Sequence, residues 1–226
     1  MNRQPYDDDV RARLDRRDII AMQALAPLSS TYLPWSQSAM RPSSVAAVLN
    51  EIVIHQRRTI VELGSGVSSC YIARLLRNRD GHLWTVEHDE KWADLVEQLL
   101  AAEGLSDRVT VVRAALAPLA AAWPDEDSSW YEREILRDSF ADLSIDLLVV
   151  DGPPAYQVGK GHSRYPAALF FAPMLADDYA VILDDAHRPG EQDILDRWEE
   201  QLDITFDCHL VNSRVGIGRS RAAFTV

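Results

Sequence analysis

The chain has 226 residues, of which 47% are apolar and 26% charged, a balance that is ordinary for a soluble globular protein with one full core. Its net charge of −12 disfavours nucleic acid as a partner, because a phosphate backbone would be repelled. No apolar run is long enough to span a bilayer and the first residues form no secretory signal, so we expect no membrane association. The two cysteines, Cys70 and Cys208, form no disulfide framework, which predicts a reducing, cytoplasmic setting.

Residues 1–42 are predicted to form an arm or lid ahead of the main domain at residues 43–226. Between positions 7 and 25, apolar side chains recur at helical spacing, which predicts a helix with one apolar face. The residues expected to line that face are Val10, Leu14, Ile19 and Met22. The arm is either a solvated segment, a cover for a ligand, or a contact with a second copy in a homodimer.

From residue 42 onward, predicted helices alternate with short apolar, β-branched runs. Strands are expected at residues 59–63, 82–86, 109–112, 145–150 and 179–183. Helices are expected at residues 42–52, 68–79, 89–100, 166–175 and 194–202, and residues 114–122 are predicted to be helix or linker. Two further strands, at residues 204–211 and 215–226, are separated by a turn. The alternation predicts an α/β fold with a doubly wound, parallel sheet.

The first predicted strand, Thr59–Leu63, runs directly into the turn Gly64-Ser65-Gly66. Glycine has no Cβ, so the backbone of this turn can approach a ligand closely, and the free N–H groups of the next helix point toward that ligand. Glu62 lies two residues before the first glycine. Glu87 ends the second predicted strand, at the spacing from which an acid reaches ribose hydroxyls. Together these features predict a nucleoside-binding site.

The run Glu62-Leu63-Gly64-Ser65-Gly66, followed by Val86-Glu87-His88-Asp89, resembles the nucleoside-binding half of class I S-adenosylmethionine-dependent methyltransferases. The resemblance extends from about residue 45 to the C-terminus. It implies a Rossmann-like, mainly parallel seven-stranded sheet that ends in an antiparallel hairpin, with S-adenosylmethionine as the cofactor. The residues that it assigns to the cofactor are Glu62, Gly64, Ser65, Gly66, Ser68, Glu87, His88 and Asp151.

Three alternatives to this resemblance stay open. A nicotinamide-dependent oxidoreductase is a second hypothesis, which is weakened because nicotinamide-binding turns carry a third glycine and Ser69 stands at that position here. A non-catalytic, methyltransferase-like domain that serves as an assembly partner is another. The plainest interpretation is a tight strand–helix turn that binds no ligand.

Three further acids, Asp151, Asp184 and Asp185, follow two predicted central strands. Ligands of open parallel sheets bind beyond these carboxyl ends, where like charges at short range need a retained proton or a cation. Oxygen ligands alone favour a hard ion such as Mg²⁺, so we expect a magnesium site here, unless the aspartates serve turn and helix capping. The pattern is similar to the metal sites of catechol-type and of sugar or macrolide O-methyltransferases, and an Asp at position 185 is closer to the second group.

This resemblance implies methylation of a hydroxyl group on a small-molecule acceptor. Members of both groups carry a catalytic Lys or Asp shortly after the first of these acids, whereas this chain has Gly152-Pro153-Pro154 there. The candidate general bases nearby are Lys160, His162 and His187, each of which is otherwise a solvated loop residue. Arg164 and Arg188 either bind an acidic group of the substrate or balance the carboxylates.

Overall fold

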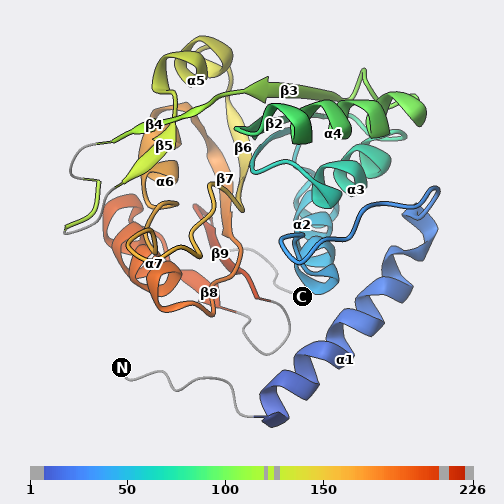
Figure 1. The fold of residues 1–226 in the computed structure, drawn as a ribbon, viewed down its shortest axis with the longest axis horizontal. Helices are drawn as coiled ribbons and strands as arrows, with labels where there is room; N and C mark the ends of the chain where they lie inside the picture. The colour runs from blue at the N-terminus through green and yellow to red at the C-terminus, as the bar shows by residue number, and fades with distance from the viewer. Residues whose placement is uncertain (1–7, 120–121, 125–127, 209–213, 222–226) are drawn as a thin grey trace.

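The computed structural model describes residues 8–119, 122–124, 128–208 and 214–221. A seven-stranded sheet runs through it in the order β3-β2-β1-β6-β7-β9-β8 (Figure 1). Its strands are β1 Thr59–Leu63, β2 His82–Glu87, β3 Val109–Arg113, β6 Ile145–Val150, β7 Leu175–Leu183, β8 Phe206–Cys208 and β9 Gly216–Arg219. Strands β1, β2, β3, β6 and β7 are parallel, and β9 runs antiparallel to β7 and β8. The predicted α/β, Rossmann-like fold with an antiparallel strand pair near the end of the chain is confirmed.

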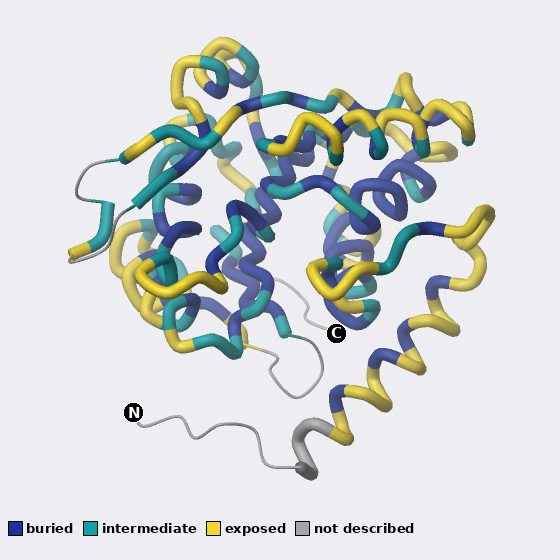
Figure 2. Tube along the Cα trace, viewed as in Figure 1, coloured by how far each residue is buried: buried dark blue, intermediate teal, exposed yellow. Residues whose placement is uncertain are grey.

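Helices cover both faces of this sheet, and dark, buried backbone lies between them (Figure 2). Helices α2 Pro42–His55, α3 Val67–Leu76 and α4 Glu90–Ala102 pack on one face, and α5 Arg133–Phe140, α6 Pro166–Phe171 and α7 Pro189–Leu202 pack on the other. Successive side chains of a strand point to opposite faces. Ile60 therefore joins the core under the first set of helices and Val61 joins the core under the second. This double burial explains why the central strands read as nearly continuous apolar runs.

Helix α6 is shorter than the helix predicted at residues 166–175. It ends at Phe171, a 3-10 turn follows at Ala172–Met174, and Leu175 already belongs to β7. Pro173 accounts for the early end, because proline has no N–H to donate and its ring clashes with the preceding turn of a helix.

The segment predicted as helix or linker at residues 114–122 contains a strand. Strand β4 (Leu116–Pro118) pairs antiparallel with β5 (Ser129–Tyr131) in a separate two-stranded sheet. Trp130 and Tyr131 are almost fully buried, at 1% exposure, so the backbone beside them needs hydrogen-bond partners that β4 supplies. Alanine-rich composition favours a helix, but the burial of this aromatic pair overrides that weak propensity.

Helix α1 (Asp8–Leu25) lies against α2 at the edge of the molecule (Figure 1). Its buried side chains, one or two turns apart, are Leu14, Asp18, Ala21 and Leu25. The predicted apolar face is confirmed for Leu14 and wrong for Ile19 and Met22, which are exposed at 62% and 40%. Val10 has a side chain outside the described part of the chain. No helix in the described ranges combines the length and the apolar character that crossing a bilayer requires.

The first turn of α2 is capped from α1. Asp18 accepts hydrogen bonds from the backbone nitrogen of Ser43 at 3.1 Å and from its hydroxyl at 2.7 Å. An acid at this position satisfies an otherwise unpaired N–H at the helix start. The start of α2 is therefore capped by a side chain of a different helix.

Candidate functional site

The candidate site lies where β1 and β6 end side by side. These strands are neighbours, but the chain continues from β1 to β2 on one side and from β6 to β7 on the other, which is the switch point where open α/β sheets bind ligands. Gly64 has a φ of 94°, in the left-handed region, and a Cβ there would lie 3.0 Å from the backbone nitrogen of Gly152. A Cβ on Gly152 would collide with the hydroxyl of Tyr131. Glycine is therefore required on both sides of the switch point.

Glu62 anchors the turn between β1 and α3 from inside the strand. It is fully buried, and its Oε2 accepts hydrogen bonds from the hydroxyls of Ser69 and of Thr85, the latter at 2.8 Å. Ser69 in turn accepts a bond from the Gly66 backbone nitrogen at 2.9 Å. Glu62 Oε1 is buried and has no hydrogen-bond partner among the described residues. Burial raises the pKa of the Glu62 carboxyl, and Ser68 lies beside it in the first turn of α3.

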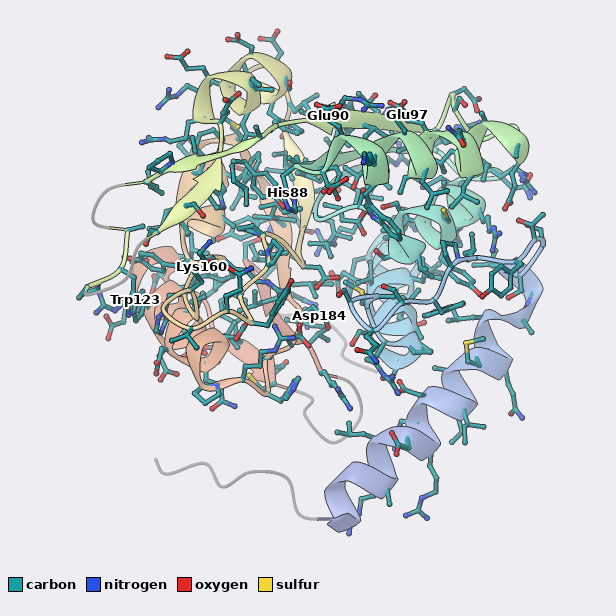
Figure 3. All side chains as sticks on the ribbon, in the orientation of Figure 1. His88, Glu90, Glu97, Trp123, Lys160 and Asp184 are labelled. Atoms are coloured by element: carbon teal, nitrogen blue, oxygen red, sulfur yellow. The ribbon has the colours of Figure 1, made fainter. Side chains whose placement is uncertain are left out.

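Glu87, at the end of β2, is held in one orientation by both of its carboxylate oxygens. Oε2 accepts bonds from the Ser65 backbone nitrogen at 3.2 Å and hydroxyl at 2.9 Å. Oε1 accepts bonds from the backbone nitrogens of His88 and Asp89, each at 2.8 Å, and the His88 ring nitrogen lies 3.0 Å away (Figure 3 labels His88). Burial alone would raise the pKa of Glu87, but these bonds hold it below its usual value. The structure thus brings together the predicted turn residues, Glu87 and His88.

The three strand-end aspartates also meet. Strands β6 and β7 are in register up to Val150 and Leu183, so the residues that follow them lie side by side. One ligand atom from each of Asp151, Asp184 and Asp185 lies within 4.8 Å of the others. Asp185 adopts a φ of 56°, a left-handed conformation that is rare outside glycine and clusters at functional sites.

The electrostatics of this cluster are unfavourable for three free carboxylates. Burial, and next the charge of Asp184, raise the pKa of Asp151 well above its usual value. Burial and the neighbouring Asp185 raise the pKa of Asp184 to about 6. Asp184 Oδ1 is buried and has no hydrogen-bond partner in the described part of the chain, although the equally unbonded Ser44 hydroxyl is near enough to lower the pKa of Asp184. The guanidinium of Arg164 lies among these acids, 3.1 Å from Asp151 and 3.4 Å from Asp185.

The three candidate bases, His187, His162 and Lys160, have different surroundings. His187 follows Asp185 by two residues, and burial lowers the pKa of its imidazole. His162 stacks on Trp123, with ring centroids 3.8 Å apart, and lies 3.2 Å from Asp193 of α7. Lys160 lies on the loop before α6, between Trp123 and Asp184 in the view of Figure 3.

Two buried residues at this site were not predicted from the sequence. The Tyr131 hydroxyl, beside Gly152, has no hydrogen-bond partner in the described ranges, and Glu191 of α7 is 1% exposed next to Arg164 and Arg188. No local signal marks Tyr131, because β5 reaches the site only through its pairing with β4. Glu191 lies in the first turn of α7 after Pro189, where an acid is ordinary helix chemistry.

The strand order, the glycine turn after β1 and the acid at the end of β2 define the class I methyltransferase fold. Residues 61–186, more than half of the chain, match a family model described as a methyltransferase domain. The chain belongs to this family of methyltransferase domains. The expected class of protein, a class I methyltransferase, is thereby confirmed.

Solved structures agree at the level of the fold. An S-adenosylhomocysteine-bound methyltransferase from Podospora anserina aligns with a TM-score of 0.63 and 12% identity, covering 97% of both chains. The O-methyltransferase TomG from Streptomyces achromogenes, in complex with S-adenosylmethionine, aligns at 0.52 and 16%, covering 95% of this chain and 90% of its own. An O-methyltransferase from Bacillus cereus in complex with S-adenosylhomocysteine aligns at 0.51 and 18%, covering 95% and 91%. No curated protein matches the sequence.

Proposed function

We propose that the chain transfers the methyl group of S-adenosylmethionine to a hydroxyl oxygen of a small molecule. The observation that carries this proposal is the pair of clusters at one switch point: Glu62, Glu87 and the glycine turn on one side, and Asp151, Asp184 and Asp185 on the other. The first cluster has the chemistry of a nucleoside site and the second that of a cation site. Methyltransferases with S-adenosylmethionine or its product bound share the fold, which supports the same cofactor here.

For the cofactor, Glu87 accepts from ribose hydroxyls in exchange for the bond that its Oε2 now accepts from the Ser65 hydroxyl. The backbone bonds from Ser65, His88 and Asp89 keep the carboxylate ionised and fixed. The bound sulfonium compound provides an activated methyl group. Glu62 Oε1 and the turn Gly64-Ser65-Gly66 offer polar atoms and an unobstructed backbone for its remaining groups. The predicted cofactor residues Ser68 and Asp151 flank the same turn and the neighbouring strand end.

We propose further that Asp151, Asp184 and Asp185 hold Mg²⁺. Two observations support the fit: three carboxylates share one centre, and Asp184 Oδ1 is buried without a hydrogen-bond partner in the described residues. Counting Glu191, four acids face two arginines, Arg164 and Arg188, so a divalent cation offsets the excess negative charge that the cluster carries when its carboxyls are ionised. Mg²⁺ at such a site lowers the pKa of a chelated hydroxyl and orients it.

Methyl transfer to an oxygen requires that the acceptor hydroxyl lose its proton as the oxygen–carbon bond forms and the carbon–sulfur bond breaks. Among the candidates Lys160, His162 and His187, we propose His187 as the base. It stands two residues beyond Asp185 and is close enough for Asp185 and Arg164 to affect its charge. His162 is already engaged by Trp123 and Asp193 on the surface of α7, which favours an indirect role for it.

Calorimetry with S-adenosylmethionine and its demethylated product tests the cofactor site. Glu87→Ala removes the ribose acceptor and Gly64→Val obstructs the switch point, so each should weaken binding at least about tenfold. Glu90→Ala is the matched control, because Glu90 lies three residues away on α4 and is 73% exposed (Figure 3). Equal affinities in all four proteins would show that the site is assigned wrongly.

Removal of divalent cations tests the metal proposal separately. Methyl transfer to small phenols, sugars or acids should fall after EDTA treatment and return when Mg²⁺ is added. Activity that is undiminished by EDTA would remove Mg²⁺ and leave the cofactor site intact. Binding of NADH without binding of S-adenosylmethionine would favour the oxidoreductase hypothesis. Cofactor binding without transfer to any acceptor would favour the non-catalytic one.

We also propose that α1 provides a contact between two copies of the chain. Ile19 and Ile20 project from α1 at 62% and 56% exposure, on the side away from the stripe that packs on α2. With Met22, exposed at 40%, they form a group of neighbouring apolar side chains on one helix, the kind of surface at which proteins associate. Analytical ultracentrifugation of the full chain and of Ile19→Lys tests this, and a wild-type monomer at micromolar concentration would contradict it.

A further inference from the structure

Arg164 is a buried cation inside the strand-end cluster. Its side chain is only 4% exposed, and it reaches the cluster from the loop between β6 and α6. Burial of a guanidinium costs free energy that hydrogen bonds to its N–H donors must offset. The partners of those donors therefore indicate the role of Arg164.

Most of these bonds go to the backbone of the two strand ends. Arg164 Nη2 donates to the carbonyl oxygen of Asp151 at 2.6 Å, and Nη1 donates to that of Asp184 at 3.1 Å. Nε donates to the carbonyl oxygen of Pro153 at 3.4 Å. One planar group therefore ties the chain after β6 to the chain after β7. Only arginine has a rigid fork of donors with this reach.

The remaining contacts select carboxylate oxygens. Nη2 also donates to Oδ1 of Asp151 at 3.1 Å and Nη1 to Oδ2 of Asp185 at 3.4 Å, so each of these two carboxylates uses one oxygen toward the arginine. Nη1 also lies 3.7 Å from Oε1 of Glu191. Arg188 lies 2.8 Å from the same Oδ2 of Asp185. Asp184, whose backbone Arg164 holds, keeps a buried Oδ1 that bonds to nothing else in the described residues.

We propose that Arg164 is a positioning residue that fixes both strand ends and rotates Asp151 and Asp185 so that their second oxygens, with Asp184 Oδ1, face one cation. This inference rests on the proposed metal site. Arg164 acts through the carboxylates and touches neither cation nor acceptor. Partners of this outer kind orient metal ligands, and their loss typically weakens metal affinity by about 10- to 100-fold.

The chain offers a matched control in Arg57. It is 3% exposed, lies 3.0 Å from Glu51, and donates to both the carbonyl oxygen and the carboxylate of Asp178 at 2.9 and 2.8 Å. Like Arg164, it is a buried arginine that bonds to carboxylates and to a backbone carbonyl. It precedes β1, however, whereas Asp184 follows β7, so the two lie at opposite ends of the parallel strands. An effect of losing a buried arginine in general would therefore appear in both.

The experiment compares full-length wild type, Arg164→Lys and Arg57→Lys. Mn²⁺ replaces Mg²⁺ as the probe, titrated by electron paramagnetic resonance; S-adenosylhomocysteine binding is measured by calorimetry, and melting temperature with and without Mn²⁺. Lysine keeps the charge and loses the fork. Arg164→Lys should weaken Mn²⁺ binding at least about tenfold and reduce the Mn²⁺-dependent rise in melting temperature accordingly. Arg57→Lys should change Mn²⁺ affinity by less than about twofold, because distant sites act independently.

Each outcome decides the proposal. Equal loss of Mn²⁺ affinity in both variants, or retained affinity in Arg164→Lys, overturns it, as does a wild type that binds S-adenosylhomocysteine but no Mn²⁺. In that last case the methyltransferase proposal survives, whereas failure to bind S-adenosylhomocysteine sinks the proposed function itself. If Arg164→Lys does not fold, Arg164→Gln, which keeps N–H donors without a charge, gives the same comparison.

Discussion

A cluster of arginines and acids lies at each end of the parallel strands, and the two clusters differ in how their charges are paired. At the end where β1 begins, Glu51 receives two bonds from Arg57 on one oxygen and two from Arg219 on the other, and Arg57 also binds Asp178. With Asp207 3.9 Å from Arg219 and His55 3.6 Å from Glu51, three acids here face two arginines and a histidine, and both oxygens of the buried Glu51 are bonded. At the opposite end, where the strands terminate, four acids face two arginines and Asp184 Oδ1 is unbonded among the described residues.

The difference separates a structural cluster from one that is prepared for a ligand. A closed set of charge-assisted bonds holds elements together and leaves nothing for a ligand to satisfy. An excess of buried negative charge is costly in the empty protein and becomes favourable when a cation arrives. Buried charge alone does not mark a functional site, therefore, and what distinguishes the strand-end cluster is its buried carboxylate oxygen without a hydrogen bond in the described residues. Four changes test this comparison.

Glu51→Ala should have the largest effect on stability. It leaves Arg57 and Arg219 without their shared carboxylate, and breaking a buried ion pair on one side costs about 3–5 kcal/mol. Urea denaturation should show this loss in the free energy of unfolding. Binding of S-adenosylhomocysteine to the folded fraction should stay at the wild-type value, and a parallel loss of binding would contradict the assignment of this cluster as structural.

Asp184→Asn should lower activity strongly and stability little, the reverse of the effect of Glu51→Ala. It removes the unbonded carboxylate oxygen, so the rate of methyl transfer should fall by about 100-fold, roughly 2.7 kcal/mol of transition-state stabilisation. The free energy of unfolding without metal should rise or change by less than about 1 kcal/mol, because an uncompensated buried charge disappears. Steady-state kinetics in Mg²⁺ and urea denaturation in EDTA measure the two quantities. A large loss of stability would place Asp184 with the structural cluster instead.

The stability of the protein should fall as pH rises through neutrality, because a buried acid of the strand-end cluster then loses its proton. Burial raises the pKa of Glu191 to about 7, so the native state holds a proton there that the unfolded state releases. Its contribution to stability is present below the unfolded pKa and is lost as pH rises through about 7. Glu191→Gln mimics the protonated form. The variant should gain about 2 kcal/mol relative to wild type between pH 5 and pH 8, measured by denaturation at each pH.

Arg113→Ala should have the smallest effect. Arg113 ends β3 and contacts Glu90 and Glu97 of α4 at 2.7 Å each (the two acids are labelled in Figure 3) and Asp94 at 2.9 Å. The three acids are exposed and Arg113 itself is half-buried. Exposed ion pairs contribute little, because water and salt screen them and the side chains lose freedom. Melting temperature and cofactor affinity should both match wild type. A measurable loss of affinity would show that the end of β3 belongs to the cofactor site.

The sequence was a good guide wherever one short segment decides the outcome. The turn after β1 follows from Gly64 and Gly66 alone, and the position of Glu87 follows from its place at the end of the next strand. It failed at residues 114–122, where alanines favour a helix and only the burial of Trp130 explains the strand. It failed also on α1, where the stripe that packs on α2 includes the polar Asp18, which no count of apolar positions selects.

By itself, then, the sequence determined the order of the strands and helices except β4, β5 and α5, the glycine turn and the acids that end the strands, because helix and strand periods and glycine's freedom are local properties. The tertiary structure decided which acids share a centre and what stands beside them. Arg164 lies 13 residues from Asp151 and 20 from Asp184 in the chain, and its bonds to both exist only because β6 and β7 are neighbours in the sheet. No local sequence pattern predicts the distant partners of an arginine side chain, so only the fold could show which carboxylates Arg164 contacts.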